Sequence, residues 1–315
     1  MSEQRSAVSN QPLLVIQLIG ILNITRDSFS DGGRFLDSEA GLEHARQLAA
    51  DGADIIDVGA ESTHPDAEDV PAEVEIERLT PVIERLKADD VVVSVDTHKA
   101  AVLRHVLALG ADLINDVTAL RDPEAVAAVR DSDARLIIMH SRASGARAER
   151  RVTTPPSRRT WPLEKRPCHP PASTRRNSDT IVDEIVAFFE RRVAELTAAW
   201  IDRRRLILDP GMGFFLSPRP EDSLAVLRGL ERIGALGLPV CVSTSRKSFI
   251  GSVLGGEGKP CPVAQRGAGT LATELWAARH GAAYIRTHDV RALRDALAML
   301  AAIERGAPPA PSVGD

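Results

Sequence analysis

The chain has 315 residues, of which 43% are hydrophobic, enough apolar material for one large domain or two smaller ones. Its net charge of −5 argues against a nucleic-acid-binding protein that depends on overall basicity. The three cysteines, Cys168, Cys241 and Cys261, show no CxxC spacing, so the sequence gives no support to a zinc site and indicates a reducing, cytoplasmic location.

The N-terminal segment 1–12 is polar, and we expect it to be a flexible end. The apolar run behind it, 13–22, is short of the roughly 20 residues that a membrane-spanning helix needs. No small-residue cleavage site follows this run, so it does not resemble a signal peptide. We interpret it as a buried strand and expect no membrane partner.

Eight short apolar runs alternate with amphipathic helical patterns along the chain. Continuous Val, Ile and Leu runs are typical of strands that are buried on both faces of a parallel sheet. Eight strand–helix units predict an α/β fold, a (β/α)8 TIM barrel that forms one domain over residues 13–304. An open doubly wound sheet is the alternative. The eight runs are 13–22, 54–59, 91–96, 112–117, 135–140, 205–209, 238–243 and 282–288.

Polar residues gather where these predicted strands end. Active sites of TIM barrels form at the C-terminal mouth, so we expect these side chains to converge on one pocket. The alternative for any one of them is that it only caps the next helix. The residues are Asn23, Asp57, Asp96, Asn115, Asp116, His140, Asp209, Ser245, Arg286 and His288.

Two polar loops follow the first two strands. The first, GILNITRDSFSDGG over 20–33, is rich in Thr, Ser, Asp and Gly, and Asn23 offers it a hard oxygen for Mg²⁺. The second, DIIDVGAESTHPDA over 54–67, carries Thr63 and His64 just before a helix. An ordinary helix-capping loop is the alternative for the second segment.

Buried polar residues form a third group, which contains Asp96, Asn115, Asp209 and Lys247. A buried carboxylate without a partner is costly, so such a group suits a flat heterocycle that donates hydrogen bonds from amino and lactam N–H groups. Lys247 would neutralise part of the acidic charge and bind a ligand carbonyl oxygen. A purely structural ion pair between Lys247 and Asp209 is the alternative.

Residues 141–178 interrupt the strand–helix pattern. This segment holds ten Arg or Lys residues, two Glu and six Pro, and it has no periodicity. We predict a disordered insertion after the fifth strand. A solvated loop without direct chemistry is the simple interpretation, and an anion-gathering lid or a partner-binding arm is the alternative. The tail 305–315 is expected to be a second flexible end.

The last predicted strand carries the motif YIRTHD over 284–289. Arg286 and His288 alternate along this strand, so both point to the same side. A guanidinium and an imidazole there predict a phosphate site, which is common near the last strands of this fold.

Seven motifs in this order resemble those of the dihydropteroate synthase family, and the resemblance covers roughly residues 16–304 apart from the insertion. This family condenses 6-hydroxymethyl-7,8-dihydropterin pyrophosphate with p-aminobenzoate and releases pyrophosphate in folate synthesis. The resemblance therefore implies small-molecule substrates, Mg²⁺ as the cofactor and a homodimer. The motifs are GILNITRDSFSDGG, DVGAEST, SVDTHKA, INDV, DPGMGF, SRKSFIG and IRTHDV.

The resemblance also implies roles for individual residues. Asp96, Lys247 and Asn23 are expected to be catalytic, with Asp96 stabilising a pterin carbocation after pyrophosphate leaves. The implied pterin-binding residues are Asp96, Asn115, Met139, Asp209 and Lys247. The implied pyrophosphate-binding residues are Asn23, Thr63, His64, Arg286 and His288, with Asn23 as the metal ligand. The implied aminobenzoate-binding residues are Thr63, Pro65, Phe214, Phe215, Ser245 and Lys247.

The sequence departs from the family pattern at several positions, and the departures resemble a sulfonamide-insensitive, Sul-type branch. The second loop reads His64-Pro65-Asp66 where Arg-Pro-Gly is usual, and Phe215-Leu216 stands where Gly-Lys is usual. We expect the extra ring of Phe215 to narrow the aminobenzoate pocket against a bulkier sulfonamide. The alternative is that Phe215 turns inward and only packs its loop onto the next helix.

Two other functions remain open at this point. A catalytically silent pterin-binding paralogue is compatible with His64 in place of Arg and with the unusual insertion. A pterin-binding methyltransferase domain would share the barrel and the pterin acids. Such a domain should not need Asn23 in the first loop or the pair Arg286 and His288 on the last strand, and all three are present.

Overall fold

The computed structural model describes residues 16–24, 34–61, 70–142, 179–256 and 259–305. In these ranges eight parallel strands form one sheet in the order β6-β5-β4-β3-β2-β1-β8-β7. A parallel bridge from Leu208 to Val240 joins the two ends of the sheet, so the barrel is nearly closed. The strands are β1 Gln17–Asn23, β2 Ile55–Gly59, β3 Val93–Asp96, β4 Leu113–Asp116, β5 Arg135–Met139, β6 Leu206–Asp209, β7 Cys241–Val242 and β8 Tyr284–Thr287.

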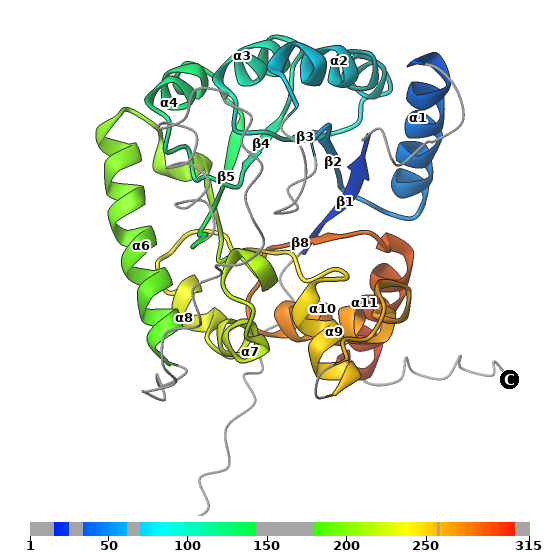
Figure 1. The fold of residues 1–315 in the computed structure, drawn as a ribbon, viewed down its shortest axis with the longest axis vertical. Coiled ribbons are helices and arrows are strands. Elements are labelled where there is room, and N and C mark those ends of the chain that lie inside the picture. The colour runs from blue at the N-terminus through cyan, green and yellow to red at the C-terminus, as the bar shows by residue number, and fades with distance from the viewer. Residues whose placement is uncertain (1–15, 25–33, 62–69, 143–178, 257–258, 306–315) are drawn as a thin grey trace, which may run out of the picture.

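Helices surround the strands on the outside of this barrel (Figure 1). The (β/α)8 prediction is therefore confirmed, and the open doubly wound sheet is wrong. The helices of the described ranges are α1 Arg34–Ala50, α2 Ala72–Ala88, α3 Ala100–Ala108, α4 Pro123–Arg130, α6 Asp179–Ala198, α7 Pro220–Arg228, α8 Leu230–Gly234, α9 Ser248–Gly255, α10 Gly267–Arg279 and α11 Val290–Arg305. Three short 3-10 turns, η1 Arg203–Arg205, η2 Gly213–Phe215 and η3 Val263–Gln265, complete these elements.

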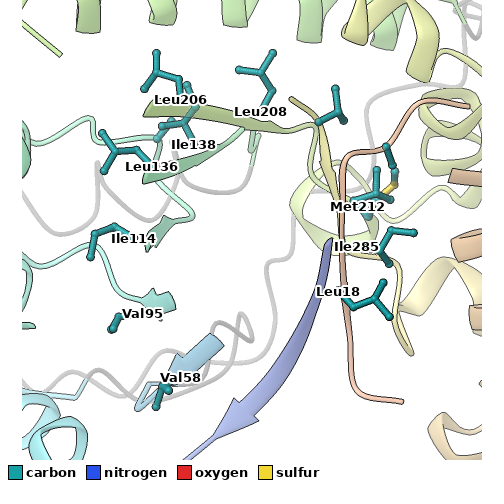
Figure 2. Packing of buried hydrophobic residues seen from close by; sticks show 14 of the residues in the cluster. Leu18, Val58, Val95, Ile114, Leu136, Ile138, Leu206, Leu208, Met212 and Ile285 are labelled. Carbon is teal, nitrogen blue, oxygen red and sulfur yellow. The ribbon is translucent and has the colours of Figure 1, made fainter. Parts of the chain in front are cut away.

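The larger hydrophobic core lies between the strands and the helices. Figure 2 shows buried side chains on several strands that contribute to it, including Val58 on β2, Ile114 on β4 and Leu208 on β6. The helices present apolar residues such as Leu79 and Phe189 to the same core, and both are fully buried. Burial on this outer face leaves the inner face of each strand free to build a second layer of side chains.

The register of the strands brings their C-terminal ends to one edge. Asn23 pairs with Gly59, Gly59 with Asp96, and Asp96 with Asn115 across β1 to β4. Met139 pairs with Asp209 across β5 and β6. Polar residues that are far apart in the sequence therefore reach the same mouth of the barrel.

Several sequence predictions fall partly outside the described residues. The segments 1–15, 143–178 and 306–315 are outside them, so the predictions of flexible ends and of a disordered insertion are not addressed. Ser141 and Arg142, at the start of the predicted insertion, are described. Among the helices that the structure describes, none has the length and apolar character needed to cross a bilayer.

Candidate active site

The inside of the barrel changes from apolar to polar toward the C-terminal ends of the strands. One buried cluster consists of Ile19, Ile55, Leu113, Ile137, Ile207, Cys241 and Tyr284. Side chains alternate between the two faces of a strand, so residues two positions further on point into the same interior. Those residues are Ile21, Asp57, Asn115, Met139, Asp209, Ser243 and Arg286. The barrel therefore has an apolar floor with a layer of charged and polar groups above it.

Asp57 organises this polar layer, although the sequence analysis assigned it only a strand-end position. Its carboxylate is 0% exposed. Oδ1 accepts a hydrogen bond from Ser94 Oγ at 2.5 Å, and Oδ2 accepts one from Asn115 Nδ2 at 3.1 Å. Oδ2 also accepts the Nε–H of Arg286 at 2.5 Å. A buried carboxylate with three donors holds the ends of β2, β3, β4 and β8 in one arrangement.

Arg286 joins the two acids of β2 and β3. Besides Asp57, its guanidinium reaches Asp96 Oδ2 through Nη2 at 2.9 Å. Burial opposes the charge on Arg286, but the two carboxylates outweigh it and raise the guanidinium pKa. Burial raises the pKa of Asp96 to about 7, although Arg286 lowers it. Two of the three guanidinium nitrogens are thus held by acids, so the predicted contact of Arg286 with phosphate depends on the third.

The predicted pterin residues Asn115, Met139 and Asp209 lie in the same layer, and all three are buried. Asp209 accepts the backbone N–H of Gly211 at Oδ1, 2.8 Å away, which fixes its carboxyl group at the turn after β6. Burial raises the pKa of Asp209, while Lys247 and Arg286 lower it. A set of acceptors arranged in this way matches a ligand that donates several N–H groups.

Lys247 stands at the N-terminus of α9 and faces this set of acids. Burial lowers its pKa to about 8, and Asp209 and Asp96 are among the charges that act on it. Lys247 and Asp209 act on each other electrostatically, although the salt bridges among the described residues do not include this pair. Instead Lys247 Nζ lies 4.9 Å from the centre of the Phe215 ring. The structure therefore brings Asp96, Asp209 and Lys247 together, as the sequence predicted.

Phe214 and Phe215 occupy η2, directly after the turn at Gly211. Phe214 is 52% exposed, whereas Phe215 is half-buried beneath Lys247. The Phe215 carbonyl accepts the backbone N–H of Arg142 at 2.9 Å, which ties η2 to the end of β5. The Phe215 ring faces Lys247, and its contact with the aminobenzoate stays a prediction.

His288 and Ser245 form a hydrogen-bonded pair at the other side of the mouth. Ser245 Oγ lies 2.9 Å from His288 Nδ1 and accepts the backbone N–H of His288 at 3.2 Å. Burial lowers the pKa of His288 to about 3, and Arg246 and Arg286 lower it further. The imidazole is therefore neutral at pH 7, and it would meet a phosphate through one N–H donor rather than through a positive charge.

Asn23 ends β1 at the level of Gly59 and is exposed at the mouth. Its Oδ1 lies over Gly59, 3.6 Å from the point that a Cβ on this glycine would occupy, and Asp96 Cβ is equally near that point. Among the described residues no group of three His, Cys, Asp or Glu side chains could hold a metal ion. A hard oxygen beside the acids fits Mg²⁺ if water and ligand oxygens complete its shell.

A second charged cluster lies beside the mouth, at the N-terminus of α3. Lys99 Nζ binds Glu61 Oε2 at 2.5 Å, Glu75 Oε2 at 2.7 Å and the Val70 carbonyl at 2.6 Å. Glu61 and Val70 flank residues 62–69, so Lys99 holds both ends of this segment. The predicted site residues Thr63, His64 and Pro65 belong to the segment and lie outside the described residues.

Strand-end polarity placed Asp57 at the pocket but missed its organising role, and it assigned no role to Lys99. The signal for Asp57 was present, because an acid in the middle of the run DIIDVG must be buried with it and must find partners. Lys99 gave no such signal, because a lysine after a strand normally faces solvent.

The chain matches the family described as pterin binding enzyme over residues 19–288. It is 44% identical over 292 residues to the "Dihydropteroate synthase type-2" of Escherichia coli, which covers 92% of this chain and 97% of that protein. It is 41% identical to the "Dihydropteroate synthase type-3" of Escherichia coli, with 89% of this chain and 97% of that protein covered.

Solved structures are similar over nearly the whole chain. The dihydropteroate synthase of Xanthomonas albilineans with 4-aminobenzoic acid has a TM-score of 0.76 and 39% identity, covering 93% of this chain and 94% of that one. The same enzyme in complex with 7,8-dihydropteroate has a TM-score of 0.73 and 37% identity, covering 95% and 96%. The barrel mouth described above therefore occurs in a chain that resembles these enzymes from end to end.

Proposed function

The chain belongs to the pterin binding enzyme family, and we propose that within it the chain acts as a dihydropteroate synthase. It condenses 6-hydroxymethyl-7,8-dihydropterin pyrophosphate with p-aminobenzoate. The C–O bond between the pterin methylene and the diphosphate breaks, and its electron pair leaves with the diphosphate. The amine of p-aminobenzoate then forms the C–N bond of 7,8-dihydropteroate and loses a proton.

One observation carries this proposal: Lys247 faces the charges of both Asp209 and Asp96 at a single barrel mouth, where Arg286 hydrogen-bonds to Asp96. The carboxylates accept the amino and ring N–H groups of the pterin, and Lys247 donates to its carbonyl oxygen. Asn115 contributes its amide, and Met139 lies against the ring. When the diphosphate leaves, the methylene gains positive charge, which Asp96 stabilises electrostatically.

The leaving diphosphate is held at the side of the mouth formed by β1 and β8. Asn23 would hold Mg²⁺, which supplies charge neutralisation to the diphosphate oxygens when it is bound. Arg286 contributes its remaining guanidinium nitrogen, and neutral His288 donates one N–H. Thr63 and His64, in the segment whose ends Lys99 holds, complete this side of the site.

The aminobenzoate lies against η2 and the N-terminus of α9. Phe214 and Phe215 border its ring, and Ser245 and Lys247 lie beside it; Thr63 and Pro65, which the family resemblance also implies, lie outside the described residues. The contact between Phe215 and Lys247 supports this placement, because a ring in that position limits the space next to the lysine. We infer that Phe215 excludes inhibitors larger than p-aminobenzoate, so that the enzyme tolerates sulfonamides and confers resistance to them.

We also infer that the chain acts in the cytoplasm as a homodimer. Neither Cys241 nor Cys261 forms a disulfide, which agrees with a reducing compartment. The surface of neighbouring helices α9, α10 and α11 (Figure 1) exposes several large apolar side chains, a composition typical of subunit interfaces. They are Val253, Leu254, Trp276, Met299 and Ile303, and Val263 of the turn η3 between α9 and α10 is exposed as well. Sedimentation velocity of the wild type and of Ile303→Lys tests whether the chain forms a homodimer. A monomeric wild type would contradict the homodimer.

A turnover assay distinguishes the enzyme from a silent pterin-binding paralogue. Purified chain is mixed with the pterin pyrophosphate, Mg²⁺ and p-aminobenzoate, and both pyrophosphate and 7,8-dihydropteroate are measured. The proposal requires both products in equal amounts. Pterin binding without release of pyrophosphate would leave only the silent paralogue. A methyltransferase domain would bind the pterin and ignore p-aminobenzoate.

A further inference from the structure

Glu274 on α10 is a buried acid with no role in the site described so far. Its side chain is 1% exposed, and its Oε1 has no hydrogen-bond partner among the described residues. The carboxyl group hydrogen-bonds to the Thr287 hydroxyl at the end of β8. Burial raises the pKa of Glu274 to about 8, the hydrogen bond with Thr287 lowers it, and Asp289, just before α11, raises it. A neutral carboxyl group also explains why one oxygen can stay without a donor at little cost.

Two hydroxyl groups connect this acid to His288. Thr287 Oγ1 lies 3.5 Å from Ser245 Oγ, and Ser245 Oγ lies 2.9 Å from His288 Nδ1. Each hydroxyl also accepts one backbone N–H: Thr287 from Asp289 at 3.3 Å, and Ser245 from His288 at 3.2 Å. We refer to Thr287 and Ser245 together as the hydroxyl relay.

Each hydroxyl has one proton to donate and two lone pairs. The protonation state of Glu274 therefore sets the direction of every hydrogen bond between it and His288. A protonated Glu274 donates to Thr287, Thr287 donates to Ser245, and Ser245 donates to His288 Nδ1. That nitrogen must then be the acceptor, and the imidazole proton resides on Nε2. An ionised Glu274 reverses every step, because Thr287 would donate to the carboxylate, Ser245 to Thr287, and Nδ1–H to Ser245.

The tautomer matters because this imidazole is neutral. The groups that act on His288 are His44 on α1, Arg246 and Lys247 before α9, and Arg286 on its own strand, and all of them oppose a positive charge on it. A neutral imidazole donates from one nitrogen only. With Nδ1 engaged by Ser245, the Nε2–H is its only means of donating to an anion.

We propose that Glu274 is a positioning residue that fixes His288 as the Nε2–H tautomer through the hydroxyl relay, so that His288 donates a hydrogen bond at the diphosphate side of the mouth. The destination of that hydrogen bond rests on the proposed function, whereas the tautomer does not. Glu274 itself touches neither substrate, and its influence reaches the site only through Thr287 and Ser245.

The tautomer is measured directly by long-range ¹H–¹⁵N correlation spectra of the ¹⁵N-labelled full chain without substrates. The His288 signals are assigned by their loss in His288→Asn. At pH 7 we expect the Nε2–H pattern in the wild type and in Glu274→Gln, whose amide still donates to Thr287. We expect a mixture of tautomers in Glu274→Leu, which donates nothing. An Nδ1–H wild type, or a leucine variant with unchanged signals, overturns the proposal.

A pH titration of the same samples adds a test that does not depend on the leucine variant folding. As pH rises through about 8, Glu274 ionises and the wild-type signals should move toward the Nδ1–H pattern. Glu274→Gln cannot ionise and should keep the Nε2–H pattern throughout. Wild-type His288 signals that do not change with pH, or signals of Glu274→Gln that do change, would contradict control of the tautomer by Glu274.

Inhibition by inorganic pyrophosphate with Mg²⁺ links the tautomer to the site. Glu274→Leu should weaken pyrophosphate by the inverse of the fraction of Nε2–H tautomer that remains, about twofold for an even mixture, and should leave the binding of a pterin without a diphosphate unchanged. A protein with the expected spectra but no turnover would refute the proposed function and leave the relay intact. A protein with normal turnover and the wrong tautomer would refute the relay alone.

Discussion

The guanidinium of Arg286 on β8 and the carboxylate of Asp57 on β2 form a buried ion pair, with Nε and Oδ2 2.5 Å apart. These residues are 229 positions apart in the sequence, and the closed barrel places their strands on either side of β1. The pair therefore fastens the last strand of the barrel to the beginning of the sheet at the level of the site.

Asp57→Asn should destabilise the protein strongly. The change removes one of the two carboxylates that hold the buried guanidinium, and because Asp96 remains, the cost should approach but not exceed the roughly 3–5 kcal/mol of breaking a buried pair. Urea denaturation measures the free energy of unfolding. Asp295→Asn, which breaks the exposed pair with Arg291, is the matched control and should cost less than about 1 kcal/mol. Equal losses in the two variants would mean that the Asp57 pair does not hold the barrel.

Asp96 should make the unliganded protein less stable as pH rises from about 4 to 7. Its pKa rises from 3.8 to about 7 on folding, mainly through burial, so the folded state binds a proton that the unfolded state has lost in this window. The free energy of unfolding therefore falls with rising pH, by at most about 1.4 kcal/mol per pH unit. Denaturation of the wild type and of Asp96→Asn at each pH gives the difference due to this carboxyl group. Parallel pH profiles would contradict a raised pKa.

The fold followed from the sequence because its signals are local. Each strand is a continuous apolar run such as 54–59, and most helices, such as α2 and α11, have their own periodicity, so eight units could be recognised without knowing how they pair. The shortest strand shows the limit: the run 238–243 forms ladder pairs only at Cys241 and Val242. The earlier residues of this run lie outside the strand, and an isolated bridge from Val240 to Leu208 closes the barrel there.

The site was only partly predictable because its contacts are not local. Asp57 finds Ser94, Asn115 and Arg286 at separations of 37, 58 and 229 residues, and only the barrel register brings them together. The orientation of Phe215 depends in the same way on where α9 places Lys247. Strand-end polarity identified Asn115 and Asp209, whereas the organising role of Asp57 required its partners in three dimensions.

Phe215→Gly should make the enzyme more sensitive to sulfonamides. Removing the ring next to Lys247 opens space that a larger inhibitor could use, whereas p-aminobenzoate, in the proposed placement, does not need this space. The inhibition constant for sulfamethoxazole should fall by more than KM for p-aminobenzoate changes. Phe214→Gly removes the neighbouring, more exposed ring and serves as the control, with a smaller change in inhibition. Shifts of equal size in the inhibition constant and KM for Phe215→Gly would refute exclusion by this ring.

Removal of Mg²⁺ should stop turnover, and Asn23→Ala should raise the Mg²⁺ concentration needed for half-maximal rate. Asn23 is expected to supply one oxygen to an ion whose other ligands are water and diphosphate, so its loss should cost about tenfold. Titration of Mg²⁺ after chelation measures both effects. Binding of a pterin without a diphosphate is the control and should be the same in wild type and variant. Turnover that persists in excess chelator would exclude the ion from the reaction.

Gly211→Ala should damage the turn that carries η2, and the reason is steric. Gly211 has a φ of +71°, and a Cβ there would lie 2.3 Å from the His140 carbonyl oxygen. The backbone conformation alone costs an alanine roughly 1–3 kcal/mol, and the clash must also move Asp209, whose Oδ1 accepts the Gly211 N–H. Gly234→Ala is the control, since a Cβ at the end of α8 meets nothing within 4 Å and should leave stability unchanged or raise it by up to about 1 kcal/mol. Gly211→Ala should have a lower unfolding temperature and a lower affinity for pterin than the wild type. A variant with the wild-type values of both would show that the turn tolerates a side chain.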